Sequence, residues 1–143
     1  MHRTLFLILF LFTLPLLSVS ANENVTLKKP PVSLKQWYKP DNKRNVFQHN
    51  MFKLRRELQA INQYRKEEDL ALTQKWVTKF VEHYRKIADM VPEWKSELSH
   101  DRAEQLETGS KEGNYRTIAR AIKKLQKNCR DCHDSYRTQV TAI

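Results

Sequence analysis

The chain has 143 residues, a formal net charge of +10 and 40% hydrophobic residues, which suffices for one domain with a modest core but not comfortably for two. The basic residues are spread along the chain and interleaved with acids, without an arginine-rich tract, which argues against a nucleic-acid-binding protein. A Ser/His/Asp pattern and a Gly-rich phosphate loop are both absent, so the sequence predicts no enzymatic activity.

The first residues have the pattern of a secretory signal peptide. Met1-His2-Arg3 is followed by an apolar run from Leu5 to Leu17 and then by small residues up to Ala21. Val19-Ser20-Ala21 fits the small-x-small cleavage rule, which predicts a signal peptide over residues 1–21 and export to the periplasm. The alternative is an uncleaved membrane anchor, but the apolar run is short for a bilayer span. We expect no stable membrane insertion after cleavage.

Residues 22–44 are predicted to form an extended N-terminal segment. Pro30, Pro31 and Pro40 fix the backbone and remove hydrogen-bond donors, so no helix is expected to run through this segment. Its apolar side chains, Leu34, Trp37 and Tyr38, could pack across the domain that follows. A disordered linker is the alternative, and the sequence does not decide between them.

Two long amphipathic helices are expected after the prolines. The first, over residues 45–64, has an apolar stripe at helical spacing: Phe47, Met51, Leu54, Leu58 and Ile61. The second, over residues 69–91, is predicted to begin with Asp69 as its N-cap and to end before Pro92. Its wide apolar face is typical of a helix in a bundle core.

Two further helices complete the predicted fold. A shorter one over residues 98–109 is expected to end with Gly109 as its C-cap, and Asn114 can cap the last helix, over residues 114–138. The sequences at residues 66–70 and 111–115 are similar, which indicates two similar helical hairpins. Residues 45–143 are therefore predicted to form an all-α, up-down-up-down four-helix bundle. The last helix has an unbroken apolar seam: Tyr115, Ile118, Ile122, Leu125, Cys129, Cys132 and Tyr136.

The C-terminal end of that seam contains the candidate cofactor-binding residues. Cys129-Arg130-Asp131-Cys132-His133 reads C-x-x-C-H, the attachment motif of haem c. One helical turn separates the two thiols, which matches the vinyl groups on adjacent pyrrole rings, and each thiol adds to one vinyl group to form a thioether. His133 then lies under the iron as its proximal axial ligand. The sequence predicts one covalently attached haem c.

Three other interpretations of the motif are weaker. A redox-active C-x-x-C pair usually lies at a helix N-terminus, whereas this pair lies near a C-terminus, where the helix dipole acts in the opposite direction. A structural zinc site needs about four ligands, and the chain has no second cysteine pair. A structural disulfide in an exported helical interaction protein would explain neither His133 nor the position of both cysteines on the seam.

The motif on the last helix, followed by Tyr136-Arg137, resembles the class II c-type cytochromes, the cytochrome c prime group, over about residues 45–138. The resemblance implies a four-helix bundle with the motif on its last helix, and a homodimer through the first two helices. It also implies that a residue of the first helix faces the sixth iron position. The segment at residues 22–44 departs from the compact pattern of the family.

Met51 and His49 compete for the sixth iron position. The two residues are two positions apart, so their side chains point to nearly opposite sides of a helix. Met51 lies on the apolar stripe and His49 on the polar face, which makes Met51 the candidate distal iron ligand. The alternative for Met51 is a core residue that fills an irregular gap.

The sequence supports weaker predictions for four other residues. His83 is expected to be a core histidine with its hydrogen bonds satisfied, Met90 is a remote candidate ligand, and His100 is expected to be exposed. Arg137 follows His133 by four residues and so shares its helix face. By resemblance, Arg137 is a candidate contact of the proximal imidazole or of a haem propionate, with a solvated basic residue as the alternative.

These residues favour electron transfer as the function. Methionine and histidine as axial ligands raise the reduction potential of a haem, and the basic surface would steer docking to an acidic redox partner protein. The alternative is a high-spin, cytochrome c prime-like protein that binds small gases such as NO or CO at an open distal site.

Overall fold

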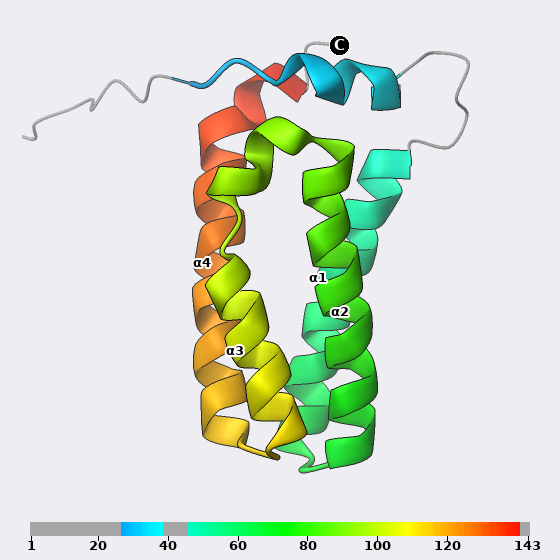
Figure 1. The fold of residues 1–143 in the computed structure, drawn as a ribbon, viewed down its shortest axis with the longest axis vertical. Helices are drawn as coiled ribbons and strands as arrows, with labels where there is room; N and C mark the ends of the chain where they lie inside the picture. Colours follow the sequence, from blue (N-terminus) through cyan, green and yellow to red (C-terminus); the bar gives the residue numbers. More distant parts are fainter. Residues whose placement is uncertain (1–26, 39–45, 141–143) are drawn as a thin grey trace, which may run out of the picture.

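The computed structural model describes residues 27–38 and 46–140, and every regular element in these ranges is helical (Figure 1). The four long helices follow one another in alternating directions: α1 (Val46–Lys66), α2 (Leu70–Met90), α3 (His100–Lys111) and α4 (Tyr115–Val140). The predicted all-α bundle is confirmed, and each α-helix begins and ends within two residues of its predicted bounds. The predicted signal peptide lies outside the described residues. None of the helices within the described residues could cross a membrane.

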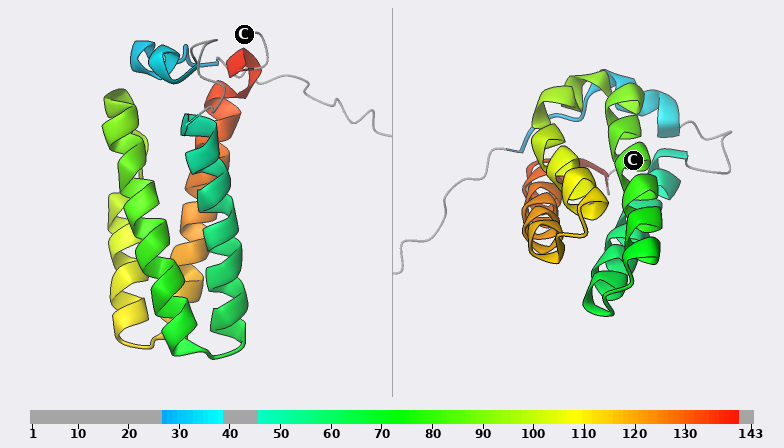
Figure 2. Two further views of the ribbon diagram at one scale, coloured as in Figure 1. Left: turned by 90° about the vertical axis from the view of Figure 1, so that its right-hand side faces the viewer. Right: turned by 60° about the horizontal axis from the view of Figure 1, so that its bottom comes forward.

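Two short 3-10 helices extend the bundle. η2 (Pro92–Glu97) joins α2 to α3, and η1 (Val32–Tyr38) lies across the end of the bundle at which α4 finishes (Figures 1 and 2). The core between the long helices is filled by the apolar stripes that the sequence showed. The side chains that are almost fully buried there include Ile61, Val77, Phe80, Tyr84, Leu106, Ile118 and Leu125.

The two turns at the opposite end of the bundle have the same geometry. After α1, Asp69 N–H donates to the Tyr64 carbonyl, and after α3, Asn114 N–H donates to the Gly109 carbonyl. In both turns one residue adopts the left-handed conformation, Glu68 in the first and Gly113 in the second, as expected of a Schellman motif. Both predicted N-caps are confirmed, because Asp69 accepts from Leu72 N–H and Asn114 from Thr117 N–H. The similarity seen in the sequence therefore reflects two similar hairpins.

Gly109 is not the C-cap of α3, so that prediction is wrong. The helix continues to Lys111, and Gly113 is the residue with a φ of +65°. Gly109 instead permits a close approach of α3 to α4, because a Cβ at this position would lie 2.9 Å from Cγ2 of Thr117. The sequence could not distinguish these two uses of glycine, since only the packing of α4 reveals the second.

Residues 27–38, called the strap below, pack on the bundle. Leu34 is buried and Trp37 is half-buried, and the Trp37 Nε1–H donates to the Met90 carbonyl at the end of α2 (2.8 Å). The prediction of an extended conformation is wrong for Val32–Tyr38. Pro30 and Pro31 precede the helix and do not interrupt it, and a 3-10 turn aligns residues three apart, so Leu34 and Trp37 face the bundle together.

We predict that replacing Leu34 destabilises the protein although it lies outside the four helices. Leu34→Ala should lower the free energy of unfolding in urea by about 2 kcal/mol or more, because it leaves a cavity under the strap. Val32→Ala is the matched control, since Val32 is 76% exposed in the same 3-10 helix, and should change stability by less than about 0.5 kcal/mol. Equal effects of the two substitutions would show that the strap does not pack as described.

Candidate functional site

The C-x-x-C-H motif lies within the regular part of α4, near its C-terminal end. Cys129 and Cys132 are partly buried free thiols, one turn apart on the helix face that faces the core. His133 is exposed to solvent and follows directly, at the edge of that face. All three side chains line the same cavity, so the motif is directed to a single space.

This cavity is bounded by α1, α2, η2 and α4 and has a volume of about 560 Å³. That volume falls within the range of about 300–1,000 Å³ that is typical of small-molecule and cofactor sites. Its wall is largely apolar and aromatic: Leu54, Leu58, Phe80, Tyr84, Ile87, Trp94 and Leu98. The cavity opens between α1 and α4, because its exposed lining residues come from these two helices: Phe52, Arg55, Gln59, Gln126, Arg130 and His133.

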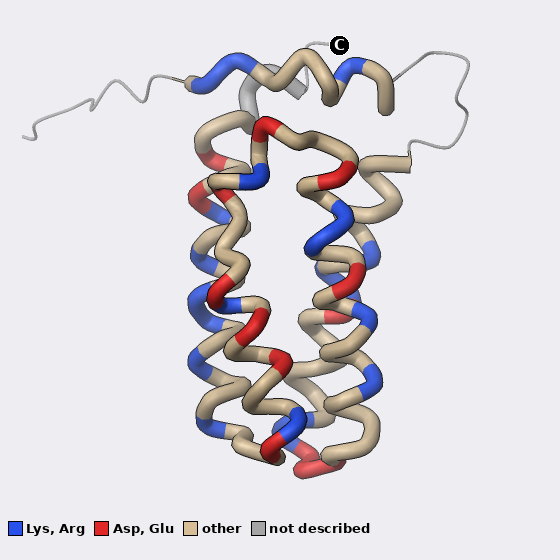
Figure 3. The backbone as a smooth tube through the Cα atoms, in the orientation of Figure 1, with Lys and Arg blue, Asp and Glu red and all other residues tan. Residues whose placement is uncertain are grey.

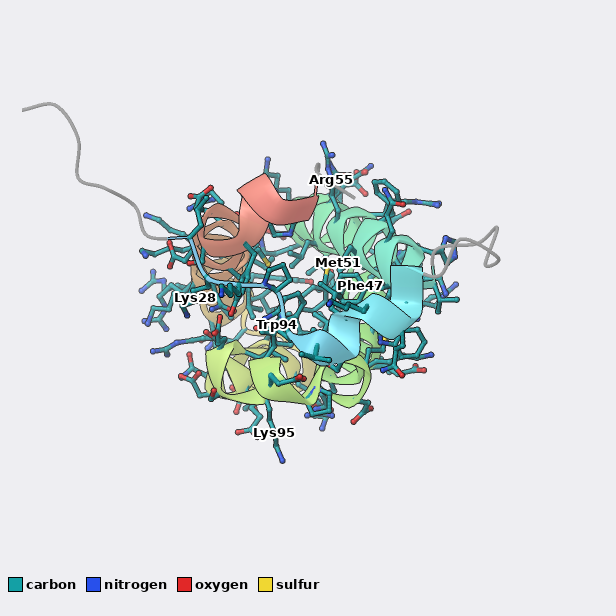
Figure 4. The ribbon with its side chains drawn as sticks, turned by 90° about the horizontal axis from the view of Figure 1, so that it is seen from above. Lys28, Phe47, Met51, Arg55, Trp94 and Lys95 are labelled. Carbon is teal, nitrogen blue, oxygen red and sulfur yellow. The ribbon has the colours of Figure 1, made fainter. Side chains whose placement is uncertain are left out.

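Met51 lines this cavity from α1 and is partly buried. Seen along the bundle, Met51, Phe47 and Trp94 extend into the interior, whereas Arg55 lies at the outside (Figure 4). His49 is exposed and lines an adjoining groove with Lys53 and Arg56 but does not line the cavity itself. The structure thus brings Met51 and the attachment motif to one cavity and leaves His49 outside it.

The other candidate ligands lie away from this cavity. His83 donates from Nδ1 to Oε1 of the buried Glu57 (2.7 Å), and its carbonyl accepts from Asn50, as expected of a satisfied core histidine. Met90 is buried below the strap. His100 is half-buried and donates from Nε2 to the Lys95 carbonyl (3.1 Å), so the expectation that it is fully exposed is wrong.

A hydrogen-bond network fixes the helical turn that precedes the motif. The Tyr84 hydroxyl donates to Oδ1 of Asn128 (2.8 Å) and accepts from the Ser99 N–H (2.9 Å). Nδ2 of Asn128 donates to the Glu97 carbonyl (2.9 Å). Burial raises the pKa of Tyr84 well above its ordinary value, so its hydroxyl stays neutral and keeps its proton for Asn128. Because Asn128 directly precedes Cys129, the network ties the motif to α2 and to the end of η2.

Trp94 forms part of the cavity wall. Its side chain is 6% exposed, and its indole Nε1 is buried. Aromatic neighbours hold the ring, with ring centroids 5.7 Å from Phe47 and 5.2 Å from Tyr136. These contacts fix the ring in the cavity wall beside the end of α4.

A second polar cluster joins the strap to the end of α4. Oε1 of Glu97 accepts from Lys28 Nζ (2.9 Å) and from the Tyr136 hydroxyl (2.8 Å), and the Lys28 N–H donates to the Ser135 carbonyl (3.0 Å). The three side chains hold the strap, η2 and α4 together beside the motif. The side chain of Arg137 lies outside the described part of the structure, so its predicted contact stays a prediction.

Both thiols are poor nucleophiles in this environment. Burial raises the pKa of Cys129, and burial together with the Glu97 carboxylate raises the pKa of Cys132 to about 11. A redox-active thiol has the opposite property, a lowered pKa. Among the described residues no three His, Cys, Asp or Glu side chains are grouped so that they could hold a metal ion by themselves.

Sequence reasoning missed the residues that position the motif. Tyr84 was expected only as part of an apolar face, although a buried tyrosine needs a partner for its hydroxyl. Asn128 gave a weak signal, as a poor helix former on the residue before the motif. Trp94 and Glu97 carry no signal in the sequence, because a 3-10 helix brings them to the site.

Comparison with known families agrees with the motif and with the fold. The family model described as Cytochrome C' matches residues 88–137, from the end of α2 to the turn after His133. Members of this family bind haem c covalently, with its iron, and the match supports the class II resemblance. No curated protein and no solved structure gives a significant match to the chain.

The residues present fit such a group. Two thiols one turn apart, a following histidine and an apolar cavity of sufficient volume meet the requirements of covalent haem attachment. The site therefore has both the covalent and the packing features of a haem c pocket.

We predict that the thiols of folded, haem-free protein react slowly with iodoacetamide near neutral pH. Alkylation of Cys132, followed by mass spectrometry, should reach half its maximal rate near pH 11. The urea-unfolded chain is the control and should do so near a pH of about 8.5. Between these two pH values the folded state retains thiol protons that the unfolded chain releases. The stability of the haem-free protein should therefore fall as the pH rises from about 8.5 to about 11.

The test requires that circular dichroism shows retained helix in the haem-free sample. A folded protein whose thiols reach half-maximal reactivity at or below a pH of about 8.5 would contradict the described burial of Cys132. It would also favour a redox role for the pair.

Proposed function

Starting from the Cytochrome C' match and the shared cavity, we propose that this chain is an exported monohaem c-type cytochrome that carries single electrons. Cys129 and Cys132 would hold haem c through thioethers, His133 would be the proximal ligand and Met51 the distal ligand. The observation that carries the proposal is that the motif on α4 and the Met51 thioether on α1 line one apolar cavity.

The haem, when bound, supplies a one-electron ferric/ferrous couple, and the protein supplies ligands and surroundings. Methionine and histidine as axial ligands favour a high potential. The apolar wall suits an apolar macrocycle, and the network of Tyr84 and Asn128 holds the motif in one position relative to α2 and η2. A motif held in one position suits the transfer of an electron without a change of ligands.

Localisation and partners follow from the same proposal. The pattern at residues 1–21 and the periplasmic location that is typical of the matched family support a periplasmic protein. The net positive charge supports an acidic redox partner. A homodimer through α1 and α2 stays a prediction.

We predict one haem per chain in protein matured in a host that attaches haem c. The haem should remain with the polypeptide after acid-acetone extraction and give a pyridine haemochrome spectrum. Cys129→Ala/Cys132→Ala should abolish covalent attachment, whereas Ser135→Ala on the next turn of α4 should retain it. Colourless wild-type protein without added porphyrin mass would contradict the proposal.

We further predict that Met51 is the sixth iron ligand. Met51→Leu conserves volume and should convert a low-spin haem into a high-spin haem that binds carbon monoxide in its ferrous state. Met90→Leu is the matched control, because Met90 is equally a methionine but does not line the cavity, and its spectrum should equal that of the wild type.

The same spectra test the gas-binding alternative. Wild-type protein that is high-spin in both redox states, and that binds carbon monoxide as readily as Met51→Leu, would exclude Met51 as a ligand. It would favour an open distal site for small gases, with haem attachment unchanged.

A further inference from the structure

The outer side of α4 carries an uninterrupted basic face. Between Tyr115 and Arg130 the helix contains no Asp or Glu. Its lysine and arginine side chains are all exposed and recur at helical spacing opposite the buried seam; together they are called the basic face: Arg116, Arg120, Lys123, Lys124, Lys127 and Arg130. Figure 3 shows these positions in blue along α4. Over this stretch of α4 the basic residues are therefore not interleaved with acids, which first recur at Asp131.

The basic face does not serve the stability of the fold. Like charges three and four residues apart on a helix repel each other, and Arg116 lies in the first turn, where the helix dipole disfavours a cation. Among the described residues, the one ion pair made by these side chains joins Lys127 to Asp131 (2.7 Å). A surface that costs stability and leaves its charges largely unpaired is suited to a binding role.

The basic face leads to the opening of the cavity. Arg130, its last member, is exposed and also lines the cavity. Arg55 and Phe52 line the same opening from α1, and Phe52 is 55% exposed. An exposed aromatic ring bordered by cations is therefore placed where an electron would enter or leave the pocket.

We propose that the basic face of α4 and the opening beside Phe52 form the docking surface for an acidic redox protein; this rests on the proposed function. In the encounter one electron passes between the partner's redox centre and the haem iron, one centre being oxidised and the other reduced, and no bond or proton moves. The field along α4 guides the partner towards Arg130, which raises the rate of association.

An acidic protein fits this surface better than an anionic membrane. A helix that binds a membrane surface places an apolar face in the bilayer, but the apolar face of α4 is buried in the bundle. Apart from Phe52 at the cavity opening, the exposed large apolar residues in the described ranges lie elsewhere, on the strap, at the start of α1 and at the start of α2.

The test uses ferric holoprotein and a reduced plant-type [2Fe–2S] ferredoxin as an acidic one-electron donor. Stopped-flow measurement should show that the second-order rate constant of haem reduction falls at least tenfold between about 0.01 M and about 0.5 M salt. Lys123→Glu/Lys124→Glu should lower the rate constant about tenfold or more at low salt. Both side chains are exposed, unpaired among the described residues and more than one turn away from Cys129.

Lys75→Glu/Lys86→Glu is the matched control. These exposed lysines lie on α2, which is diagonal to α4 in the bundle, and their reversal changes the net charge equally. The control should lower the rate constant by less than about threefold, because it changes the net charge of the protein but leaves the basic face of α4 unaltered. The reduction potential of each variant is measured to confirm an unchanged driving force.

Three results would overturn the docking proposal. One is a rate constant that Lys123→Glu/Lys124→Glu leaves unchanged. Another is a rate constant that falls as much in the control variant Lys75→Glu/Lys86→Glu as in Lys123→Glu/Lys124→Glu. The third is cosedimentation with phosphatidylglycerol vesicles at about 0.15 M salt that depends on Lys123 and Lys124 while the ferredoxin rate does not. If the haem is still reduced in these experiments, only the docking proposal fails and the proposed function stands. Protein without haem would refute the proposed function itself.

Discussion

The site depends on a single constraint, the orientation of α4 about its own axis. One helix face must fill the bundle core with Ile118, Ile122 and Leu125 and, further along, present Cys129 and Cys132 to the cavity. Because both tasks use the same seam, a rotation of α4 that removed the cysteines from the cavity would also expose the core residues. The free energy of burying the apolar seam therefore holds the attachment motif in place.

The remaining elements complete the space that α4 defines. α1 supplies Met51 and the Arg55 rim, α2 supplies the aromatic wall with Phe80 and Tyr84, and η2 adds Trp94. The pairing of Tyr84 with Asn128 joins α2 to α4 beside the motif. The cavity wall is largely apolar and its polar lining residues gather at the opening, which suits a macrocycle with polar groups only at its edge.

The two faces of α4 have opposed physical roles. The inner face is apolar and stabilises the bundle, while the outer face concentrates positive charge. The strap also contacts the end of α4, through the cluster of Lys28, Glu97 and Tyr136. One helix thus joins the cofactor site, the charged surface and the closure of the bundle end, and the docking proposal depends on this proximity.

The sequence by itself determined the helices, their caps at Asp69 and Asn114, and the C-x-x-C-H motif from Cys129 to His133, because helical periodicity and a five-residue motif are local properties. It also favoured Met51 over His49, since that choice depends on the face of one helix. The tertiary structure alone decided that Gly109 serves close packing and that the strap folds into a 3-10 helix. It alone placed Trp94, Asn128 and Glu97 at the site. These features depend on contacts between residues far apart in the chain, whose distances no local pattern encodes.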